Sequence, residues 1–436
     1  MMQERKHIIV GSRASELALV QTNWVIQLLQ PKFPDYEFKI EKISTQGDKI
    51  LDVALSKIGS KNLFTKELDR AIIEKKVDFV VHSLKDVPTI MPESTVLGCI
   101  CRRHSCHDAV IMSANFQGYK LVNLPDNSII GTSSVRRCAS LKRVYPNLKF
   151  ESIRGNLNTR LAKLNRTHPN SNTNYDAIIL AEAGINRLGW DLLISETLDE
   201  MPYAVSQGAL TCQCREDDDF ILNMLSNIHH EGTCLQVVAE RAFMNRLDGG
   251  CSTPIGVKTL PVIPEMVKES KRLSFLELTG WVYNAEGSQE LTSNMATNLP
   301  FTVSSLRKRR FSTSDYSTNS SDSEQCPVYL NPGPEYDGSA QVLKTKISND
   351  EIETANNPDS VVMGIKVKPI CRIGLLRMAR ARQLGQELAK YLLSQGADKI
   401  LEKVKADAKA NNYIMSSQTL LTLCNENDKI SSDLNK

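Results

Sequence analysis

The sequence predicts an α/β protein with two domains of similar plan, followed by a small α+β domain. Over the first 230 residues, short β-branched runs alternate with helical patterns, which is typical of mainly parallel sheets. The same succession of strand, turn and helix begins again near residue 128, and this repetition predicts the second domain. Apolar and polar residues then alternate over 273–283, which predicts a small antiparallel sheet in the third domain.

The first domain is expected to open with a strand over 7–11 and a helix over 15–30, which Pro31 ends. Its remaining elements are a strand over 39–45, a polar and mobile loop over 46–62, a helix over 64–76 and a buried strand over 77–83. The second domain has a strand and turn over 128–134, a helix over 135–146, a strand over 148–153, a helix over 156–166, and a strand, turn and helix over 175–189. Residues 206–215 then carry the chain back to the first domain, because short connections lead to neighbouring elements.

The third domain is expected to begin with a helix. Thr233 and Gln236 have the spacing of a capping box, and Gly249 is a typical C-terminal stop. A last helix over 379–394 carries leucines one turn apart and ends at Gly396.

Residues 303–360 lack periodicity and are rich in Ser, Asn and Asp, so we expect them to be disordered. Their basic run, 307–310, is interpreted as part of this solvated loop, with a nuclear-localisation or phosphate-binding patch as the alternative. The predicted boundaries are 1–108 with 208–230 for the first domain, 109–207 for the second, 231–410 for the third and 411–436 for a flexible tail.

The charge balance gives no general argument for binding to nucleic acid or to an anionic membrane, and we expect neither partner. Lys and Arg number 53 against 50 Asp and Glu, a formal net charge of only +3, so any basic site must be local. No stretch approaches the roughly 18 apolar residues of a membrane span, and the first apolar run is too short for a secretory signal. The 11 cysteines follow no disulfide-scaffold pattern, so we expect reduced thiols and a cytoplasmic protein.

Arginines and serines gather where the predicted strands pass into helices. Segments 11–15 and 131–137 both follow strands and open helices, and helix N-termini attract carboxylates and phosphates. A single arginine would more often be a solvated surface residue. Several at one sheet edge predict a polyanion site, because ligands bind outside the carboxyl ends of parallel strands. The arginines concerned are Arg13, Arg136, Arg137, Arg154, Arg160 and Arg187.

Asp86 lies in HSLKDVP, 82–88, at the end of a strand that should be buried. Pro88 disfavours helix at Val87, so Lys85 and Asp86 are expected on a turn. Two interpretations stay open. Asp86 forms a structural ion pair with an arginine, or its carboxylate binds N–H donors of the ligand and stabilises positive charge that develops during reaction.

Cys251 follows two glycines just beyond a predicted helix. Structural cysteines usually lie inside strands or helices, whereas a loop cysteine suits a reactive thiolate or the attachment of a prosthetic group. A rival cluster has residue types that suit zinc, but its spacing is not that of a zinc finger and we expect no metal site. It contains Cys99, Cys101, His104, Cys106 and His107.

Taken together, the motifs resemble those of porphobilinogen deaminases, in order, over residues 7 to about 285. They are SRASELALVQT (12–22), KNLFTKEL (61–68), HSLKDVPT (82–89), GTSSVRR (131–137), IRGNLNTRL (153–161), AGINRLGW (183–190), SQGAL (206–210) and GGCSTPIG (249–256). The resemblance implies two domains like those of type II periplasmic binding proteins and a small α+β C-terminal domain that carries the cysteine.

The resemblance also implies a transferase of haem biosynthesis that joins four porphobilinogen molecules head-to-tail into hydroxymethylbilane and releases ammonia. It implies a dipyrromethane cofactor attached through Cys251, and a catalytic Asp86 that hydrogen-bonds pyrrole N–H groups. A monomer suffices for this activity. Cofactor and substrate would be bound by Arg13, Ser15, Ser83, Lys85, Ser133, Ser134, Arg136, Arg137, Arg154, Gly155, Asn156, Arg160, Arg187 and Gln207.

The sequence departs from the family pattern at Thr211, Cys212 and Gln213, where glycine, an aliphatic residue and glutamate are usual. This departure puts the local packing of the return crossing in question. Two other functions are weighed against the resemblance. One is a non-catalytic organic-anion-binding protein of the same fold, which predicts an export signal. The other is a zinc-dependent regulator built on the 99–107 cluster and the basic run.

Overall fold

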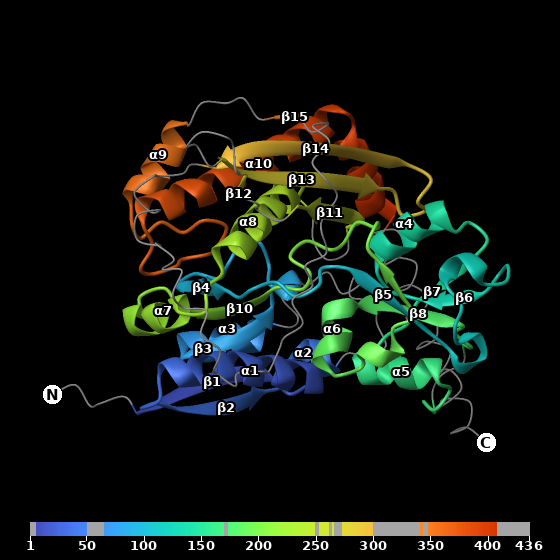
Figure 1. The fold of residues 1–436 in the computed structure, drawn as a ribbon, viewed down its shortest axis with the longest axis horizontal. Coiled ribbons are helices and arrows are strands. Elements are labelled where there is room, and N and C mark those ends of the chain that lie inside the picture. Colours follow the sequence, from blue (N-terminus) through green and yellow to red (C-terminus); the bar gives the residue numbers. More distant parts are fainter. Residues whose placement is uncertain are drawn as a thin grey trace, which may run out of the picture.

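The computed structural model arranges the chain around three five-stranded sheets (Figure 1). Four predicted features lie wholly or mostly outside the described residues: the loop 46–62, Cys251, the basic run 307–310 and the tail 411–436. The described ranges are 6–49, 65–169, 173–248, 253–260, 264–265, 273–299, 341–342 and 348–407.

The first sheet has the strand order β2-β1-β3-β10-β4. Its first three strands run parallel, whereas β10 is antiparallel to both of its neighbours, so the chain returns to this sheet as the sequence predicts. The strands are β1 (His7–Arg13), β2 (Glu37–Ile43), β3 (Phe79–Ser83), β4 (Thr95–Ile100) and β10 (Leu210–Arg215). The helices of this part are α1 (Glu16–Leu29), η1 (Gln30–Lys32), α2 (Gln46–Lys49), α3 (Lys66–Ile73), η3 (Leu84–Asp86) and α7 (Asp219–Ser226).

The second sheet, β7-β6-β8-β5-β9, repeats this plan. Three parallel strands are followed by an antiparallel strand, β5, which arrives from the first sheet. The repetition confirms the predicted pair of α/β units; the domain boundaries stay a prediction. The strands are β5 (Asp108–Met112), β6 (Ile129–Gly131), β7 (Lys149–Glu151), β8 (Ala177–Ala181) and β9 (Glu196–Leu198). The helices are η4 (Ala114–Phe116), η5 (Leu121–Asn123), α4 (Val135–Val144), α5 (Leu157–Leu164), α6 (Glu182–Arg187) and η6 (Asp191–Leu193).

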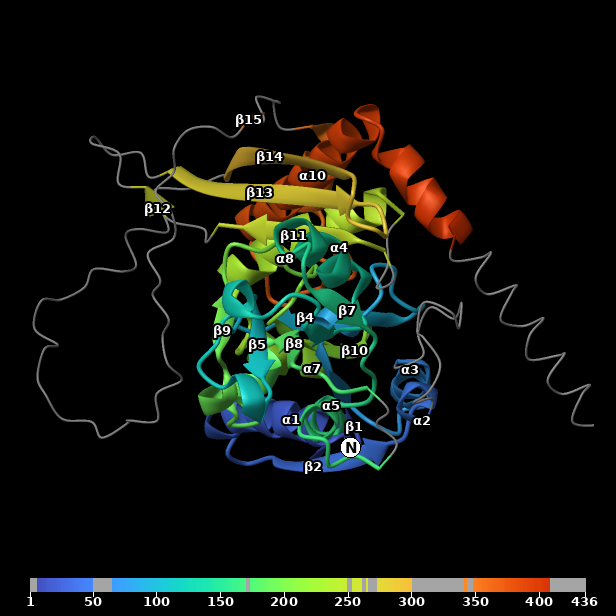
Figure 2. The ribbon, with the colours of Figure 1, turned by 90° about the vertical axis from the view of Figure 1, so that its right-hand side faces the viewer.

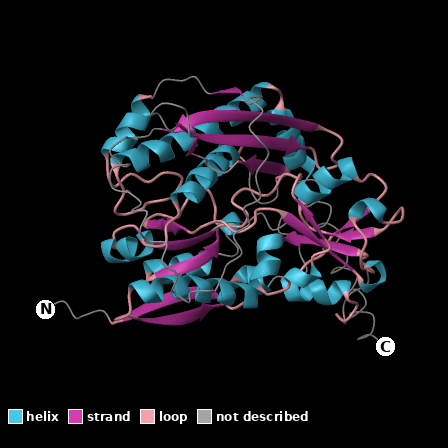
Figure 3. Cartoon of the chain, viewed as in Figure 1, coloured by secondary structure: helices cyan, strands magenta, loops and turns pink. Residues whose placement is uncertain are grey.

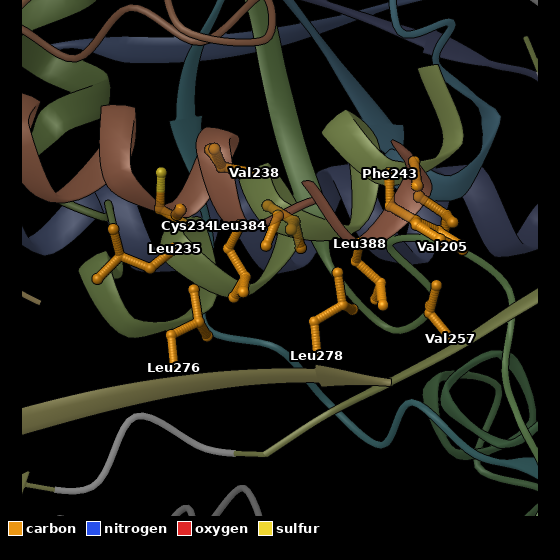
Figure 4. Close-up of a cluster of buried hydrophobic side chains, with 14 of the residues drawn as sticks. Val205, Cys234, Leu235, Val238, Phe243, Val257, Leu276, Leu278, Leu384 and Leu388 are labelled. Atoms are coloured by element: carbon orange, nitrogen blue, oxygen red, sulfur yellow. The ribbon is translucent and has the colours of Figure 1, made fainter. Parts of the chain in front are cut away.

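The third sheet lies above the other two in Figure 1, and Figure 2 shows the same stacking from the side. Its centre is the hairpin of β13 and β14, which confirms the predicted antiparallel sheet, and helices α8 and α10 pack against it (Figure 3). Leu276 and Leu278 of β13 face Leu384 and Leu388 of α10, with Val238 of α8 close by (Figure 4). The elements are α8 (Glu231–Arg246), β11 (Ile255–Thr259), β12 (Pro264–Glu265), β13 (Leu273–Tyr283), β14 (Glu290–Leu299), β15 (Gln341–Val342), α9 (Asn349–Asn356) and α10 (Arg372–Ser394).

Two helices begin earlier than the sequence predicts. Helix α8 starts at Glu231, and its N-cap is His230, whose Nδ1 accepts from the Thr233 N–H at 3.1 Å. The predicted capping box at Thr233 is therefore wrong, because a histidine ring takes the capping role one turn earlier. Helix α10 starts at Arg372 because the Cys371 Sγ accepts from the Gly374 N–H at 3.4 Å.

The segment predicted to be disordered contains structure at its C-terminal end. Ser348 and Glu351 form a reciprocal capping box that begins α9, and Glu351 is buried with its carboxylate 3.5 Å from Arg380 of α10. Burial of this ion pair explains why a polar sequence with little periodicity is helical here. Downstream, the Leu97 N–H donates to Gly364 O at 2.8 Å, so the segment after α9 covers the edge of β4.

None of the helices in the described ranges has the length and apolar composition that a bilayer crossing requires.

Candidate functional site

The turn after β3 presents Asp86 because its neighbours are anchored in the core. Leu84 and Val87 are buried, whereas Lys85 is half-buried and Asp86 is exposed. The Val87 N–H donates to Leu84 O at 3.2 Å, which closes the turn, and the Leu84 N–H donates to Ala209 O at 2.9 Å. Asp86 has no ion-pair partner within 4.0 Å among the described residues, so the structure does not favour the structural ion pair.

Lys85 connects this turn to a buried network on the two segments that cross between the first and second sheets, residues 101–107 and 199–209. Its Nζ donates to Gln207 Oε1 at 3.4 Å, and Gln207 Nε2 donates to Asp108 Oδ1 at 2.8 Å. Burial lowers the pKa of Lys85 to about 8, helped by the charges of Arg137 and Arg136 and opposed by those of Asp86 and Asp108. The predicted residues Lys85, Asp86 and Gln207 are therefore brought together.

Asp108 is the acid that holds the two adjacent arginines of α4. Its carboxylate accepts from Arg137 Nη2 at 2.6 Å and from Arg136 Nη2 at 2.8 Å, and all three side chains are buried. Burial alone would raise the pKa of Asp108, but the two guanidinium groups outweigh it and hold that pKa well below its usual range.

Backbone carbonyl groups accept hydrogen bonds from the Nη1 atom of each of these arginines. Arg136 Nη1 donates to Pro202 O at 2.6 Å, and Arg137 Nη1 donates to Ile179 O at 2.9 Å. Arg136 is thus enclosed by structural partners. Arg137 lies close enough to Arg160 for its charge to affect the pKa of that residue.

A second group of cations surrounds the N-terminus of α5. Burial, together with the charges of Arg137 and Arg154, lowers the pKa of Arg160 to about 10. Arg160 Nε donates to Gly155 O at 2.9 Å, and the Asn156 side chain caps the helix by accepting from the Thr159 N–H at 2.9 Å. Gly155 has φ +105°, and a Cβ there would lie 2.5 Å from Thr159 Cγ2, so the turn requires glycine. These mutually repelling cations form a site that an anion would stabilise.

The predicted serines lie at strand and helix ends. Ser15 and Ser134 are the N-caps of α1 and α4, and only Ser134 accepts a cap hydrogen bond, from the Arg137 N–H at 3.4 Å. Ser133 Oγ donates to Ile153 O at 2.6 Å, and Ser83 Oγ donates to Gln21 Oε1 at 3.2 Å.

Arg13 and Arg187 lie on elements next to the network. Arg13 is half-buried at the end of β1, and its charge contributes to lowering the pKa of His82. Arg187 ends α6, where its Nη2 donates to Gly208 O at 2.8 Å, next to Gln207. Cys251 lies outside the described ranges.

Sequence reasoning missed the residues that hold the site together. Asp108 opens a buried strand and has no motif of its own; only its position directly after a crossing segment signals its role. Glu240 of α8 binds Arg103 of one crossing with both oxygens, at 2.8 and 2.7 Å, and accepts from the Ser206 N–H of the other crossing at 2.7 Å. Arg241 donates to Val87 O and Pro88 O, beside Asp86.

The residues of the rival zinc cluster do not converge. His104 packs edge-on against Trp24 with ring centroids 5.3 Å apart, and His107 packs against Tyr203 at 6.5 Å. Cys99 and Cys101 are buried in the core of the first sheet. Within the described ranges, no three His, Cys, Asp or Glu side chains are arranged to hold a metal ion.

The departure from the family pattern is accommodated within β10. Thr211 Oγ1 donates to Cys99 O at 2.7 Å, and Gln213 Nε2 donates to Asp69 Oδ1 at 2.9 Å and Thr95 Oγ1 at 3.0 Å. The strand stays paired with both neighbours, with one irregularity between Cys212 and Gln213.

Comparison with known proteins bears on what such a site serves. Residues 8–223 match the family model described as "Porphobilinogen deaminase, dipyromethane cofactor binding domain", and residues 234–304 match its C-terminal domain. The porphobilinogen deaminase of Synechococcus elongatus is 46% identical over 291 residues, which cover 66% of this chain and 86% of that protein. Those of Gloeobacter violaceus and Listeria monocytogenes are 52% and 44% identical, over 58% and 66% of this chain and 76% and 89% of theirs.

Among solved structures, the VFT2 domain of Bordetella pertussis BvgS aligns over 52% of this chain and 87% of its own, with 14% identity and a TM-score of 0.31. The identity to the deaminases extends over 76–89% of the length of these three proteins. The chain belongs to the porphobilinogen deaminase family.

Proposed function

We propose that the protein polymerises four porphobilinogen molecules into hydroxymethylbilane, with release of ammonia, on a dipyrromethane group bound covalently through Cys251. The family membership supports this reaction, and the matched family model names the cofactor. The observation that carries the proposal is a group of cations next to one exposed carboxylate. Arg137 lies near both Lys85 and Arg160, Arg154 lies near Arg160, and the exposed Asp86 follows Lys85 on the same turn.

The residues present fit an anionic pyrrole chain. Burial lowers the pKa of Arg160, and the charges of Arg137 and Arg154 lower it further, so acetate and propionate groups would supply the missing counter-charge. Guanidinium groups bind such carboxylates with paired hydrogen bonds. The bound dipyrromethane would supply a pyrrole carbon as the nucleophile and keep the growing chain attached to the protein.

Asp86 is proposed as the catalytic carboxylate. Its exposed side chain accepts hydrogen bonds from pyrrole N–H groups and stabilises positive charge as ammonia leaves. Lys85, half-buried beside it, binds a substrate carboxylate in its protonated form. Holding both groups on one closed turn supplies the orientation that a weak carbon nucleophile requires.

The remaining predicted residues are assigned to cofactor and substrate binding. Some are proposed to contact the ligand directly, and others to act through neighbouring residues. Arg154 and Arg160 are proposed as direct carboxylate ligands, and Gly155 and Asn156 as the turn that presents them. Arg136 and Gln207 are proposed to act through Asp108 and Lys85, because their polar groups have buried protein partners. The further residues proposed to bind cofactor or substrate are Arg13, Ser15, Ser83, Ser133, Ser134, Arg137 and Arg187. We also infer that the protein works as a cytoplasmic monomer.

The deciding experiment is an intact-mass measurement on the native protein and on Cys251→Ala. The native chain should carry extra mass equal to two linked pyrrole units, and the variant should carry none and form no hydroxymethylbilane. Cys138→Ala is the matched control, since Cys138 lies half-buried on α4 near the arginines and has no assigned role. A native protein without extra mass, or a Cys251→Ala protein that keeps it, contradicts the covalent attachment.

A further inference from the structure

Arg241 is a buried cation that has no acidic partner among the residues that the structure describes. It lies in the middle of α8 with 1% of its surface exposed. Its Nη1 donates to Val87 O at 3.1 Å and its Nη2 donates to Pro88 O at 2.6 Å. Burial lowers its pKa to about 10. Burying a guanidinium group without a counter-charge costs desolvation free energy. The hydrogen bonds to the two carbonyl groups offset part of this cost.

These carbonyl groups belong to the two residues directly after Asp86. The preceding part of the turn is fixed by the Leu84 N–H bond to Ala209 O and by the Val87 N–H bond to Leu84 O. Arg241 fixes the following part. Asp86 therefore projects from a short loop whose backbone is anchored on both sides.

A second contact from the same face of α8 supports this anchoring. Asn245, one turn further along, donates through Nδ2 to Thr89 Oγ1 at 3.1 Å. The neighbouring Glu240 holds the crossing that carries Gln207, through the Ser206 N–H at 2.7 Å. One helix thus locates both the Asp86 turn and the partner of Lys85.

We propose that Arg241 is a positioning residue that fixes the Asp86 carboxylate relative to α8, the helix that leads into the Cys251 loop. The proposal rests on the proposed function, because it assumes that Asp86 acts on a group held after this helix. Arg241 itself touches no substrate in this scheme. Its guanidinium group holds the turn that carries the Asp86 carboxylate. A displacement of about 1 Å in such a catalytic group lowers the rate on the order of 100-fold.

The test compares Arg241→Met and Arg241→Lys with the matched control Arg246→Met. Methionine keeps most of the apolar volume and removes both donors, whereas lysine keeps the charge but loses the fork. Arg246 is exposed on the last turn of the same helix. Three quantities are measured on the full-length protein: cofactor mass, kcat and KM with porphobilinogen, and hydrogen exchange of peptides covering 84–89 and α8.

Arg241→Met should retain the cofactor mass and a KM near that of the wild type. Its kcat should fall on the order of 10- to 100-fold, with faster exchange confined to 84–89. Arg241→Lys should fall between Arg241→Met and the wild type, and Arg246→Met should match the wild type. If Arg241→Met does not fold, Arg241→Lys carries the same test with a smaller loss of kcat.

Two results would overturn the proposal. One is wild-type kcat and wild-type exchange over 84–89 in the variant that folds. The other is a loss of kcat with exchange that accelerates equally across α8, which would indicate only a structural role. Failure of the proposed function gives a different result, since the wild-type protein itself would then lack the cofactor mass and turnover.

Discussion

The side-chain amide of Gln207 donates to the carboxylate of Asp108 at 2.8 Å. The two residues lie at the ends of the two segments that cross between the first and second sheets, so this bond ties the crossings together. Arg136 and Arg137 bind the same carboxylate, and Lys85 binds the other end of the Gln207 amide. The anion-binding residues therefore depend on a buried acid that itself faces protein groups.

Asp108→Asn should lower the stability of the whole protein. The variant leaves two buried guanidinium groups without their counter-charge, and removal of one partner of a buried ion pair costs about 3–5 kcal/mol. The depressed pKa of the acid means that its contribution is present at neutral pH and is lost only as pH falls below about 4. Urea unfolding at neutral pH measures the loss, with the exposed Asp217→Asn as the control. A free energy of unfolding equal to that of the wild type would show that the pair contributes nothing.

Asp86→Asn should keep the fold and much of the binding but lose turnover. The side chain is exposed, so its loss leaves no buried group without a partner. Asparagine still accepts a hydrogen bond but cannot stabilise developing positive charge, and kcat should fall on the order of 10²- to 10³-fold. Steady-state kinetics and thermal unfolding of the same preparation separate the two effects. Unchanged kcat in a folded Asp86→Asn protein would remove Asp86 from the mechanism.

Lys85 should make porphobilinogen capture depend on pH above neutrality. With a pKa of about 8, Lys85 is protonated below that pH and loses its charge above it. Because kcat/KM reports groups of the free enzyme, it should be flat below about pH 7.5 and fall roughly tenfold per unit well above pH 8. Lys85→Arg removes this titration, since arginine stays protonated over the range. A wild-type profile that stays flat to about pH 9.5 would contradict the assignment.

Sequence patterns predicted those strands and helices that have a local signal of their own, whereas β4, β5, β9 and α7 were not predicted. β13 alternates apolar and polar residues, and the turn after β3 is defined by Pro88 and the apolar pair Leu84 and Val87. The return of residues 206–215 to the first domain was predicted from the rule of short connections, but the position of β10 between β3 and β4 was not.

The supporting residues could not be predicted in the same way. Asp108, Glu240 and Arg241 act through contacts with residues distant in the sequence, such as Arg137, Ser206 and Val87. A single acid or arginine within an apolar element has no periodicity that reveals its partner. The early start of α8 was missed for a related reason, since histidine is an uncommon N-cap.

Gln213→Glu should destabilise the protein in a way that grows with pH. The wild-type amide is fully buried; its Nε2 donates to Asp69, and its Oε1 lies 3.0 Å from His82 Nε2. The amide oxygen can only accept, so His82 carries its proton on Nε2, and burial lowers the pKa of this histidine to about 4, which keeps it neutral.

Glutamate at position 213 would place a second carboxylate against Asp69, whose pKa burial already raises. One of the two acids must then take up a proton in the folded state. A carboxyl group with a raised folded pKa contributes stability at low pH that is lost as pH rises, so the variant should lose more free energy of unfolding at pH 8 than at pH 5. The loss at pH 8 should be about 2 kcal/mol or more.

The double variant Asp69→Asn with Gln213→Glu is the matched control for this prediction. The new amide at position 69 can donate to the carboxylate at position 213, which restores the hydrogen bond with the donor and acceptor exchanged. Urea unfolding of the wild type, both single variants and the double variant at the two pH values gives the coupling free energy between the positions. Recovery of stability at pH 8 in the double variant is the expected result. A single-variant loss that is equal at both pH values, or a double variant with no coupling, would show that charge repulsion at Gln213 is not what the wild-type amide prevents.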